Sequence, residues 1–430
     1  MGCRRTVVWA VAGALGVASG SAAASGFALY EHGSGLGNAF AGGAASAEDA
    51  STIYFNPAGL ARLSGKQIVV GAHAIRPSMK FGNTASVPAL LQPTVGGDGG
   101  DGGSWALVPS GYFAMEISPQ LRAGVGIMAP FGLKTDYNPT WMGRFQAIKS
   151  DIKTINLNPA VSYSLNDTVS IGVGLNYQHI KGELTSAVNY SAAAGGALGA
   201  GLEGYSSVSG SDSAWGGNVG VLVNAGPKTR VGLAYRSRVK YRLTGTVVFT
   251  GVPAPLAAVP ALQNGPVTLP ISMPDSASIS VFHQLNDKWD VMGDLGWMGW
   301  SVLQQLKIDR TSGLNVMTVQ ENWRDTWRIA AGSNYHYNNQ WTARVGVAYD
   351  QTPVSDAFRT ARVPDSARYQ LAVGGQYKPG KNSALDFGYS HLFMNNANIA
   401  DRQAAAGRGD LVGSFKNSVD ILSVVYAYSF

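Results

Sequence analysis

Charge and cysteine are both scarce in this sequence. Only 13% of its 430 residues are charged, against roughly 25% in an ordinary soluble domain. Such low charge argues against a disordered chain, which needs charge to stay solvated. The single cysteine, Cys3, lies in a segment that we expect to be removed. The mature chain would then contain no disulfide, no thiolate metal site and no cysteine nucleophile.

Long apolar runs are also missing. Outside the N-terminal leader no stretch reaches 18 apolar residues, which excludes a helical membrane protein. Glycine, by contrast, is abundant, at 55 of 430 residues or about 13%, against a usual ~7%. This composition leaves all-β classes as the leading options. The length alone would allow one large barrel or roughly two to three soluble domains.

The N-terminus has the three parts of a secretory signal peptide. Arg4 and Arg5 form a positive region, residues 6–18 form an apolar stretch, and Ala22-Ala23-Ala24 forms an A-x-A cleavage site. We therefore predict a signal peptide over residues 1–24, since a non-cleaved anchor helix would be too short. Removal of the two arginines takes the net charge from +6 to +4. That surplus is too small to indicate nucleic-acid binding.

From residue 66 onward apolar and polar residues alternate, which is typical of a strand with two unlike faces. In segment 341–350 the odd positions carry Trp, Ala, Val, Val and Tyr, and the even positions carry Thr, Arg, Gly, Ala and Asp. In segment 230–243 the odd positions are mostly apolar and the even positions are largely basic. The pattern predicts fourteen strands, near 66–82, 104–117, 120–130, 150–165, 168–183, 213–225, 229–249, 270–285, 288–308, 319–336, 340–350, 366–378, 383–394 and 415–430.

The connections between these strands alternate in length. Short turns of turn-forming residues, such as Ser118-Pro119, alternate with long connections, such as 184–212 and 395–414. Short turns at one end and long loops at the other are the layout of an outer-membrane barrel, and Greek-key sandwiches do not produce it. Several aromatic residues lie near predicted strand ends, where interfacial girdles would be: Trp289, Trp297, Trp300, Trp323, Trp327, Tyr335, Tyr337 and Trp341. The alternative, core aromatics of a soluble β-protein, is disfavoured because the opposite faces are too polar for a second packed layer.

Residues 25–65 behave differently from the rest of the chain. They are rich in Gly, Ala and Ser, contain Pro57 and show no β pattern, yet they carry large apolar residues that an isolated linker would not have. We expect this segment to fold into the barrel and fill it. The predicted organisation is a signal peptide (1–24), an N-terminal plug (25–65) and a transmembrane β-barrel (66–430).

No enzyme signature is present in the sequence. The six histidines are scattered without metal-ligand spacing, so no metal site is predicted. Gly59–Gln67 resembles a phosphate-binding loop but has one residue too many and lacks the Ser/Thr, and no GxSxG elbow occurs. Gly96–Gly103 resembles a single calcium-binding nonapeptide repeat; a flexible surface loop is favoured, and calcium binding stays open. We expect neither an enzyme nor a cofactor.

Arg236, Arg238 and Lys240 follow one another on the polar face of one predicted strand. In a barrel that face lines the lumen, except where the strand projects into the outer loops, and these residues could attract an anionic head group. Equally, they could be solvated, or paired with acids of the plug such as Glu48 and Asp49.

Pro130 interrupts the strand pattern near 120–130. Since proline cannot donate to a ladder, pairing should fail there. The alternative is a strand end that runs into a loop.

Short motifs across nearly all of residues 25–430 resemble those of one family. They are Ser25–Glu31, Gly33–Phe40, Glu48–Ala50, Asn56–Ala58, Pro130–Leu133, Gly143–Phe145, Lys153–Pro159, Tyr235–Ser237, Leu269-Pro270, Trp300-Ser301 and Arg328–Ala330. The chain resembles the FadL family of outer-membrane transporters of long-chain fatty acids and other hydrophobic compounds. The resemblance implies a 14-stranded barrel filled by an N-terminal hatch. It also implies that the ligand enters an apolar pocket and leaves sideways at a kinked third strand after the hatch rearranges.

This resemblance assigns roles to particular residues. Asn56, Pro57 and Ala58 match the hatch motif, and Ala129, Pro130, Phe131 and Gly132 fall where the lateral opening belongs. Arg236, Arg238 and Lys240 remain candidate head-group contacts.

The chain departs from the family at the carboxylate site. The best-known fatty-acid carriers place basic residues beyond the fifth strand and at the start of the tenth. Here those places read Leu184–Ser186 and Met317–Gln320, without positive charge. Fatty acid stays the leading substrate class, but the missing positive charge strengthens the alternative of an uncharged or aromatic hydrocarbon.

We predict a passive transporter in the outer membrane of a Gram-negative cell. Its expected partners are a hydrophobic small molecule of the long-chain fatty-acid class, outer-membrane lipid and lipopolysaccharide, and the barrel-assembly machinery, with no nucleic acid. The alternative of a different class is a general diffusion porin or structural barrel, which would have no plug. An outer-membrane lipase would need a catalytic Ser/His pair, for which no motif is present.

Overall fold

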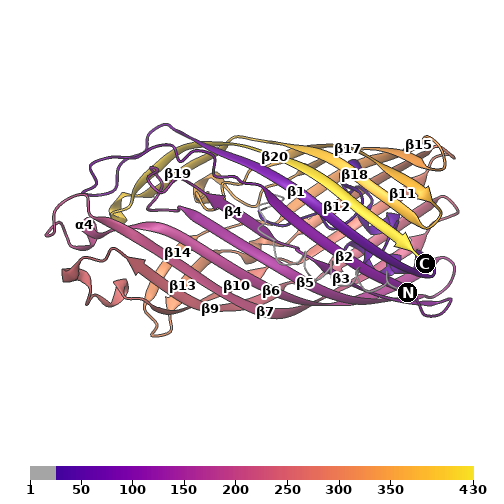
Figure 1. Cartoon of the computed structure of the whole chain (residues 1–430), viewed down its shortest axis with the longest axis horizontal. Coiled ribbons are helices and arrows are strands. Elements are labelled where there is room, and N and C mark those ends of the chain that lie inside the picture. Colours follow the sequence, from indigo (N-terminus) through magenta and orange to yellow (C-terminus); the bar gives the residue numbers. More distant parts are fainter. Residues whose placement is uncertain (1–25) are drawn as a thin grey trace, which may run out of the picture.

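The computed structural model describes residues 26–430, so the predicted signal peptide lies outside the described residues. The chain forms an elongated β-barrel whose strands run obliquely along its long axis (Figure 1). The strand segments are β1 (Lys66–Asn83), β2 (Ala106–Glu116), β3 (Leu121–Met128), β4 (Gly132–Asp136), β5 (Lys149–Ser164), β6 (Val169–Asn189), β7 (Glu203–Asn224), β8 (Thr229–Arg236), β9 (Val239–Thr250), β10 (Gly265–Met273), β11 (Ser276–Gln284), β12 (Trp289–Met298), β13 (Gln305–Arg310), β14 (Asn315–Gln320), β15 (Thr326–His336), β16 (Trp341–Asp350), β17 (Arg368–Gly380), β18 (Ser383–Met394), β19 (Ala397–Gln403) and β20 (Gly409–Ser429).

These segments make fourteen transmembrane strands, because six of the strands are interrupted once. The interrupted strands are β3/β4, β8/β9, β10/β11, β12/β13, β14/β15 and β18/β19. β1 pairs antiparallel with β20 from Gln67↔Ser429 to Asn83↔Gly413, which closes the sheet. Closure removes the free edges that would otherwise invite aggregation. The predicted 14-stranded antiparallel barrel is confirmed.

Several strands are longer than the alternation predicted. The expected loop 184–212 is wrong over much of its length, since β6 and β7 pair as far as Asn189↔Glu203. The expected loop 395–414 is also wrong in part, because it contains β19 and the start of β20. Strand pairing here continues beyond the apolar belt. There neither face has to be apolar, so the two-residue alternation disappears although the backbone ladder persists.

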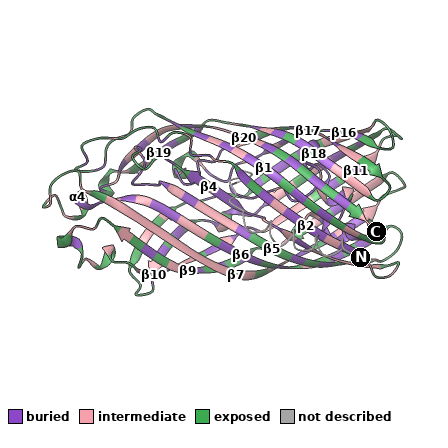
Figure 2. Ribbon diagram, viewed as in Figure 1, coloured by how far each residue is buried: buried purple, intermediate pink, exposed green. Residues whose placement is uncertain are grey.

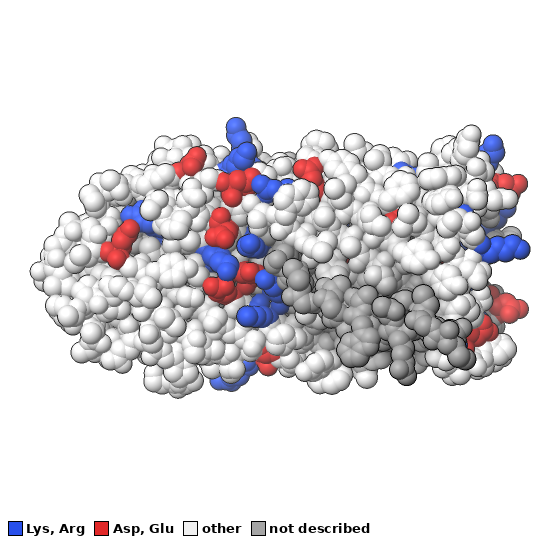
Figure 3. Space-filling model, in the orientation of Figure 1, with Lys and Arg blue, Asp and Glu red and all other residues white. Residues whose placement is uncertain are grey.

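Inside the belt the alternation is confirmed. In β16 Trp341, Val345 and Val347 are exposed, while Thr342 and Arg344 are buried, and the same alternation of colours follows the other strands (Figure 2). Charged side chains gather at the end with the short turns and in a band nearer the long loops, with a largely uncharged belt between them (Figure 3). An apolar outward face of this kind matches a barrel wall in contact with lipid.

Aromatic pairs mark both borders of the belt. Trp289–Tyr335 (4.7 Å) and Trp341–Tyr377 (4.5 Å) lie towards the short turns, and Tyr177–Trp215 (4.9 Å) and Tyr349–Tyr369 (5.0 Å) lie towards the long loops. The predicted position in an outer girdle is wrong for two residues. Trp300 and Trp323 are 0% and 2% exposed inside the barrel, because each lies in a strand interruption that turns inward.

Helices are few and short. Those of the N-terminal segment are η1 (Leu36–Asn38), α2 (Gly43–Ser46), α3 (Thr52–Phe55) and η2 (Pro57–Arg62); the others are α4 (Tyr190–Ala193), η3 (Ala254–Leu256), η4 (Pro260–Leu262), η5 (Trp300–Val302), η6 (Asp356–Phe358) and η7 (Ala404–Ala406). Among the described residues, no helix has the length and apolarity needed to cross a membrane.

The N-terminal segment lies inside the barrel, and we call it the hatch. α2 packs on β8 and β11, η1 on β15 to β18, and η2 on β5 to β7. Glycines on the lumen face make this close approach possible. A Cβ at Gly346 would lie 2.1 Å from the carbonyl carbon of Asn38, and one at Gly232 would lie 1.9 Å from the carbonyl oxygen of Ala44. Part of the glycine excess in the sequence therefore has a steric cause.

Candidate functional site

The wall is incomplete beside the third transmembrane strand. The ladder between β2 and β3 ends at Gly111↔Ile127. Beyond it β3 breaks at Pro130, and among the described residues β4 pairs with β5 alone. Proline supplies no N–H to a ladder, so the backbone at this break must find partners elsewhere.

The start of the hatch supplies those partners. The amide of Leu29 donates to the carbonyl of Pro130 (2.9 Å), and the amide of Gly132 donates to the carbonyl of Phe27 (2.9 Å). Ala28 thereby forms an antiparallel bridge with Phe131. Three hatch residues thus take the place of a strand at the position where the sequence predicted an opening.

Asn56 ties the hatch both to itself and to the wall. Its side-chain amide donates to the carbonyls of Ala44 (2.7 Å) and Val221 in β7 (3.0 Å), and its Oδ1 accepts from the amide of Ala58 (3.0 Å). Pro57 opens η2, where its fixed φ suits the first helical position. The Asn56–Ala58 motif thus forms a hydrogen-bonded turn at the start of η2. Its role in transport stays a prediction.

Three wall arginines hold backbone carbonyls of the hatch. Arg230 donates to Ala45 (2.9 Å) and Ser46 (3.0 Å), Arg236 to Tyr54 (3.0 Å), and Arg328 to Ala39 (2.7 Å). Arg236 also lies over the ring of Tyr54, 4.4 Å from its centre. The hatch is therefore clamped at several points along its length.

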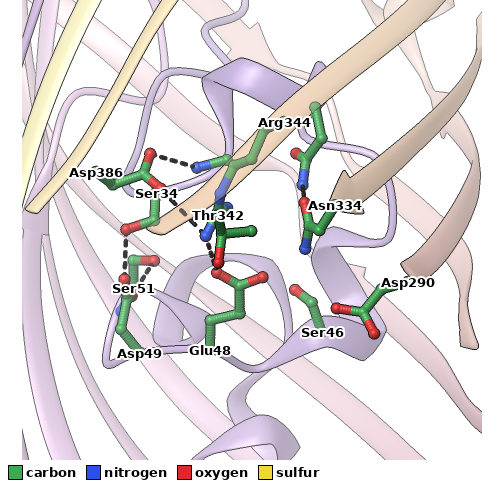
Figure 4. A network of polar contacts seen from close by, with 12 residues as sticks. Ser34, Ser46, Glu48, Asp49, Ser51, Asp290, Asn334, Thr342, Arg344 and Asp386 are labelled. Carbon is green, nitrogen blue, oxygen red and sulfur yellow. Dashed lines mark hydrogen bonds and ion pairs between the residues drawn. The ribbon is translucent and has the colours of Figure 1, made fainter. Parts of the chain in front are cut away.

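A fourth arginine forms the ionic anchor shown in Figure 4. Arg344 of β16 donates to Glu48 of the hatch (2.7 Å) and lies 3.2 Å from Asp386 of β18. Next to it, Asp49 accepts from the hydroxyls of Ser34 (2.5 Å) and Ser51 (2.6 Å). Because Arg344 and Asp386 are almost fully buried, removal of Arg344 would leave the Asp386 carboxylate buried without its cation, and breaking a buried pair in this way typically costs about 3–5 kcal/mol.

The inward and outward sides of the seventh strand exchange at the break between β8 and β9. Asn218 of β7 pairs with Arg236, and a ladder without interruption would then pair Ser211 with Leu243. Instead, Ser211 pairs with Thr244, one residue further along the strand. The single extra residue inverts which side chains point inward. Val239, Tyr241 and Leu243 are buried inside the outer half of the barrel, and β10 and β11 invert in the same way.

This inversion corrects the expected basic row. Arg236 is half-buried against the hatch, whereas Arg238 is exposed beside Asp275 at 3.4 Å and Lys240 points outward. The prediction that all three line the lumen is wrong. Regular alternation does not reveal a bulge, although Ser237 and Pro274 mark its place in hindsight.

The inverted strands surround an apolar compartment in the outer half of the barrel. Its walls combine β5, β6, β7, β9, β10 and β13, and its lining includes Ile152, Ile180, Leu184, Val208, Leu243, Val267, Leu269, Ile271, Leu306 and Ile308. No charged side chain is among these lining residues. Such a compartment is suited to a hydrocarbon chain.

An aromatic cluster lies at the inner end of the same compartment. The ring of Trp300 is centred 4.8 Å from Phe27, 5.9 Å from Phe131 and 4.9 Å from Trp323. The cluster therefore joins the hatch, the third-strand break and the ninth and tenth strands. The buried Nε1 of Trp300 has no acceptor, which leaves one donor free inside an otherwise apolar space.

A loop arginine lies beside the compartment, against Met317, which packs on the cluster that contains the lining residues Leu184, Val267 and Ile308. Arg362, from the loop between β16 and β17, is 3% exposed and makes long contacts with the carbonyl of Thr185 (3.4 Å) and Sδ of Met317 (3.8 Å). Its guanidinium also donates to the carbonyl of Lys149 and to Oγ of Ser150 (both 3.3 Å), but it forms no ion pair among the described residues. Burial lowers the pKa of Arg362 to about 10, so it is charged at neutral pH.

One of the two acids whose charge acts on Arg362, Glu321, is itself buried. Glu321 lies in the turn between β14 and β15 and accepts from Nε1 of Trp323 (2.9 Å). Burial raises the pKa of Glu321 to about 8, so it is largely neutral at pH 7. Arg362 and Glu321 were missed by the sequence patterns, and Trp300 was assigned to an outer girdle, because all three lie in loops and interruptions where no periodicity applies.

Comparisons with known proteins agree with this geometry. Residues 15–430 match the family described as "Outer membrane protein transport protein (OMPP1/FadL/TodX)". The chain is 30% identical over 425 residues to the long-chain fatty acid transport protein of Escherichia coli K12, covering 91% of this chain and 92% of that protein. It superposes on a Pseudomonas aeruginosa FadL homologue with a TM-score of 0.87 and 25% identity, over 94% of this chain and 100% of the other. The Ralstonia pickettii toluene transporter TbuX has the same fold, with a TM-score of 0.67 and 21% identity over 93% and 99% of the two chains.

Proposed function

We propose a substrate and a route from one premise: the chain belongs to the OMPP1/FadL/TodX family of outer-membrane transport proteins. It is an outer-membrane transporter of hydrophobic compounds. Members of this family are transporters and not enzymes, and the proposal includes no catalytic step. A general diffusion porin is not favoured, because the lumen is filled by the hatch.

The substrate that fits best is a long-chain fatty acid taken up by passive diffusion. The observation that supports it most is the position of Arg362, a buried cation that forms no ion pair among the described residues and contacts Met317, which packs against lining residues of the apolar compartment. A buried charge is costly unless it is paired. A carboxylate on a long hydrocarbon chain would pair with Arg362 while its tail fills the compartment.

An uncharged or aromatic hydrocarbon is the second candidate. It is favoured by the compartment lining, which has no charged side chain, and by structural neighbours described as toluene transporters. Such a ligand would use the compartment and leave Arg362 unpaired. Fatty acid is therefore preferred.

The route leads from the compartment past Phe27 and Phe131 to a lateral opening at Ala129, Pro130, Phe131 and Gly132. Each CH₂ removed from water is worth about 0.8 kcal/mol, so the fifteen carbon groups of a C16 tail amount to about 12 kcal/mol. Release into the periplasm would meet that penalty, whereas a sideways step into the bilayer avoids it. Movement of residues 27–29 would open the break, since their backbone bonds Pro130 and Gly132 on the side that faces away from β5.

Asn56, Pro57 and Ala58 are proposed to hold the hatch in its closed shape. The proposal also includes cleavage after residue 24, a hatch over residues 25–65 and a barrel over 66–430. Outer-membrane lipid, lipopolysaccharide and the barrel-assembly machinery are proposed partners. Arg236 is proposed as a clamp on the hatch, because its guanidinium is already engaged there.

Uptake of palmitic acid and of toluene by cells that express the chain tests the substrate. Palmitic acid should enter faster than in cells without the protein, and Arg362→Gln should slow it while toluene uptake is unchanged. Enhanced toluene uptake with no effect on palmitic acid would establish the second candidate instead. Large, steady ion conductance by the intact chain in a planar bilayer would contradict a hatch-filled transporter.

A further inference from the structure

The ladder between the eighth (β10/β11) and ninth (β12/β13) transmembrane strands contains a window. On the loop side the two strands pair at Val267↔Arg310 and Thr268↔Asp309, and on the turn side they pair from Ser276↔Met298 onward. Between these limits the amide of Gly299 donates to the carbonyl of Asp275 (2.9 Å), next to the Ser276↔Met298 pair, and among the described residues no ladder pair joins the two strands from there up to Thr268↔Asp309. The window is therefore bounded at both ends, unlike the open stretch between β2 and β4.

Three extra residues on the ninth strand create the window. From Thr268 to Ser276 the eighth strand advances eight positions, whereas from Met298 to Asp309 the ninth advances eleven. The surplus is folded into η5, which turns inward and buries Trp300. The backbone of the ninth strand thus leaves the wall at this level.

The eighth strand carries prolines along the edge that faces the window. The amide of Thr311 donates to the carbonyl of Pro266 (3.3 Å), so the backbone of Pro266 faces the ninth strand. Backbone groups alternate sides along a strand, so Pro270 faces the same way, and Pro274 lies in the break beyond β10. Proline has no N–H and is found on edges that lack a partner. β10 meanwhile keeps its full pairing with β9, from Gly265↔Val247 to Met273↔Val239.

The window lies between the outer aromatic belt and the apolar compartment. Trp297 and Trp327 are cross-strand partners on the outward face at its lower border. On the inside, Leu269 and Ile271 of β10 and Leu306 of β13 line the compartment. Met273 and Trp300, both 0% exposed, belong to the apolar cluster that contains these lining residues.

We propose that this window admits the hydrophobic ligand sideways, from the outer leaflet at the level of the aromatic belt into the apolar compartment. The η5 turn acts as its gate. The inference rests on the proposed function and adds an inlet in the wall to its outlet at Pro130. A ligand that partitions into the outer leaflet would then reach the compartment without crossing water.

A reversible crosslink across the window tests the inlet. The register set by Thr268↔Asp309 places position 272 opposite 305. Ser272→Cys with Gln305→Cys should, when oxidised, slow palmitic-acid uptake on the order of tenfold, equivalent to ~1.4 kcal/mol of added barrier, and reduction should restore it. Thr268→Cys with Asp309→Cys is the matched control, since it joins the same strands where they already pair. Its oxidation should leave uptake unchanged.

Pro270→Val gives a second readout that needs no crosslink. The new N–H and β-branched side chain should favour pairing across the window and slow uptake, whereas Pro266→Val, at the paired end, should not. Full-rate uptake by the closed 272–305 crosslink, or by Pro270→Val, would overturn the inlet. Wild-type protein that transports neither palmitic acid nor toluene would instead overturn the proposed function itself.

Discussion

The indole ring of Trp300 is centred 4.8 Å from the phenyl ring of Phe27, in an edge-to-face arrangement with an interplanar angle of 64°. One residue belongs to the inward turn of the ninth strand and the other to the start of the hatch. Pairs of this kind contribute about 0.5–1.5 kcal/mol beyond their burial. The carbonyl of Phe27 also accepts from the amide of Gly132 at the third-strand break. We therefore expect a movement of η5 to displace Phe27 and change this contact at the lateral opening.

Replacement of Trp300 by alanine should loosen the start of the hatch. The change removes ring contacts to Phe27, Phe131 and Trp323, and a buried Trp→Ala substitution costs about 3–5 kcal/mol. Amide hydrogen exchange at residues 27–29 should become faster while the barrel strands keep their protection. Trp327→Ala, on the exposed face of a neighbouring strand, is the control and should leave those amides protected. Equal protection in both variants would show that the cluster does not hold the hatch.

Asn56→Ala and Pro57→Ala should leave the barrel folded but impair the hatch. Asn56 makes three hydrogen bonds within the hatch and to Val221, each worth about 0.5–1.5 kcal/mol. The barrel depends on its closed ladder and should keep its heat-resistant mobility on gels. Palmitic-acid uptake should fall in both variants. Wild-type uptake in both would reduce the motif to a packing detail.

Arg362→Gln should separate the two candidate substrates. Hydrogen bonds to charged groups are worth about 1.5–3 kcal/mol, so palmitic-acid binding should weaken at least about tenfold. Toluene binding should not change, because toluene has no group for Arg362 to bind. Arg242→Gln is a suitable control, since that side chain is exposed on the outer surface. Equal loss of both ligands would mean that the variant disturbs the compartment and not the head group.

The pH dependence of binding should reveal Glu321. Burial raises its pKa to about 8, so its neutral form is favoured in the folded protein. The stability that this gives is fully present below the ordinary glutamate pKa and is lost as pH rises through about 8. Above that pH the ionised carboxylate would compete with the ligand for Arg362. Palmitic-acid affinity should therefore fall between pH 7 and 9, and Glu321→Gln should make it flat over that interval.

The sequence predicted the barrel well because alternation reports directly on a wall with one lipid face. In β16 the buried and exposed residues follow that pattern residue by residue. The ligand compartment was not predictable in the same way. The bulge between Arg236 and Val239 inverts the two faces without changing the alternation, so Tyr241 reads as lipid-facing although it is 4% exposed inside. Trp300 and Arg362 lie outside any strand, and only the folded chain brings them to the compartment.

Pro130→Val should close the lateral opening without weakening ligand binding. Unpaired backbone that faces lipid costs several kcal/mol per group, so a gap in a barrel wall needs a local cause. Here Pro130 removes one donor, and residues 27–29 cover what remains. Valine restores the donor and a strand-forming side chain, which favours a continuous third strand beside β2. Uptake should slow while the affinity for palmitic acid is retained. Pro109→Cys with Ala129→Cys, placed opposite each other by the Gly111↔Ile127 register, should have the same effect when oxidised and release it on reduction. If uptake continues at full rate with that crosslink closed, the ligand leaves through the periplasmic end of the barrel and the lateral route is wrong.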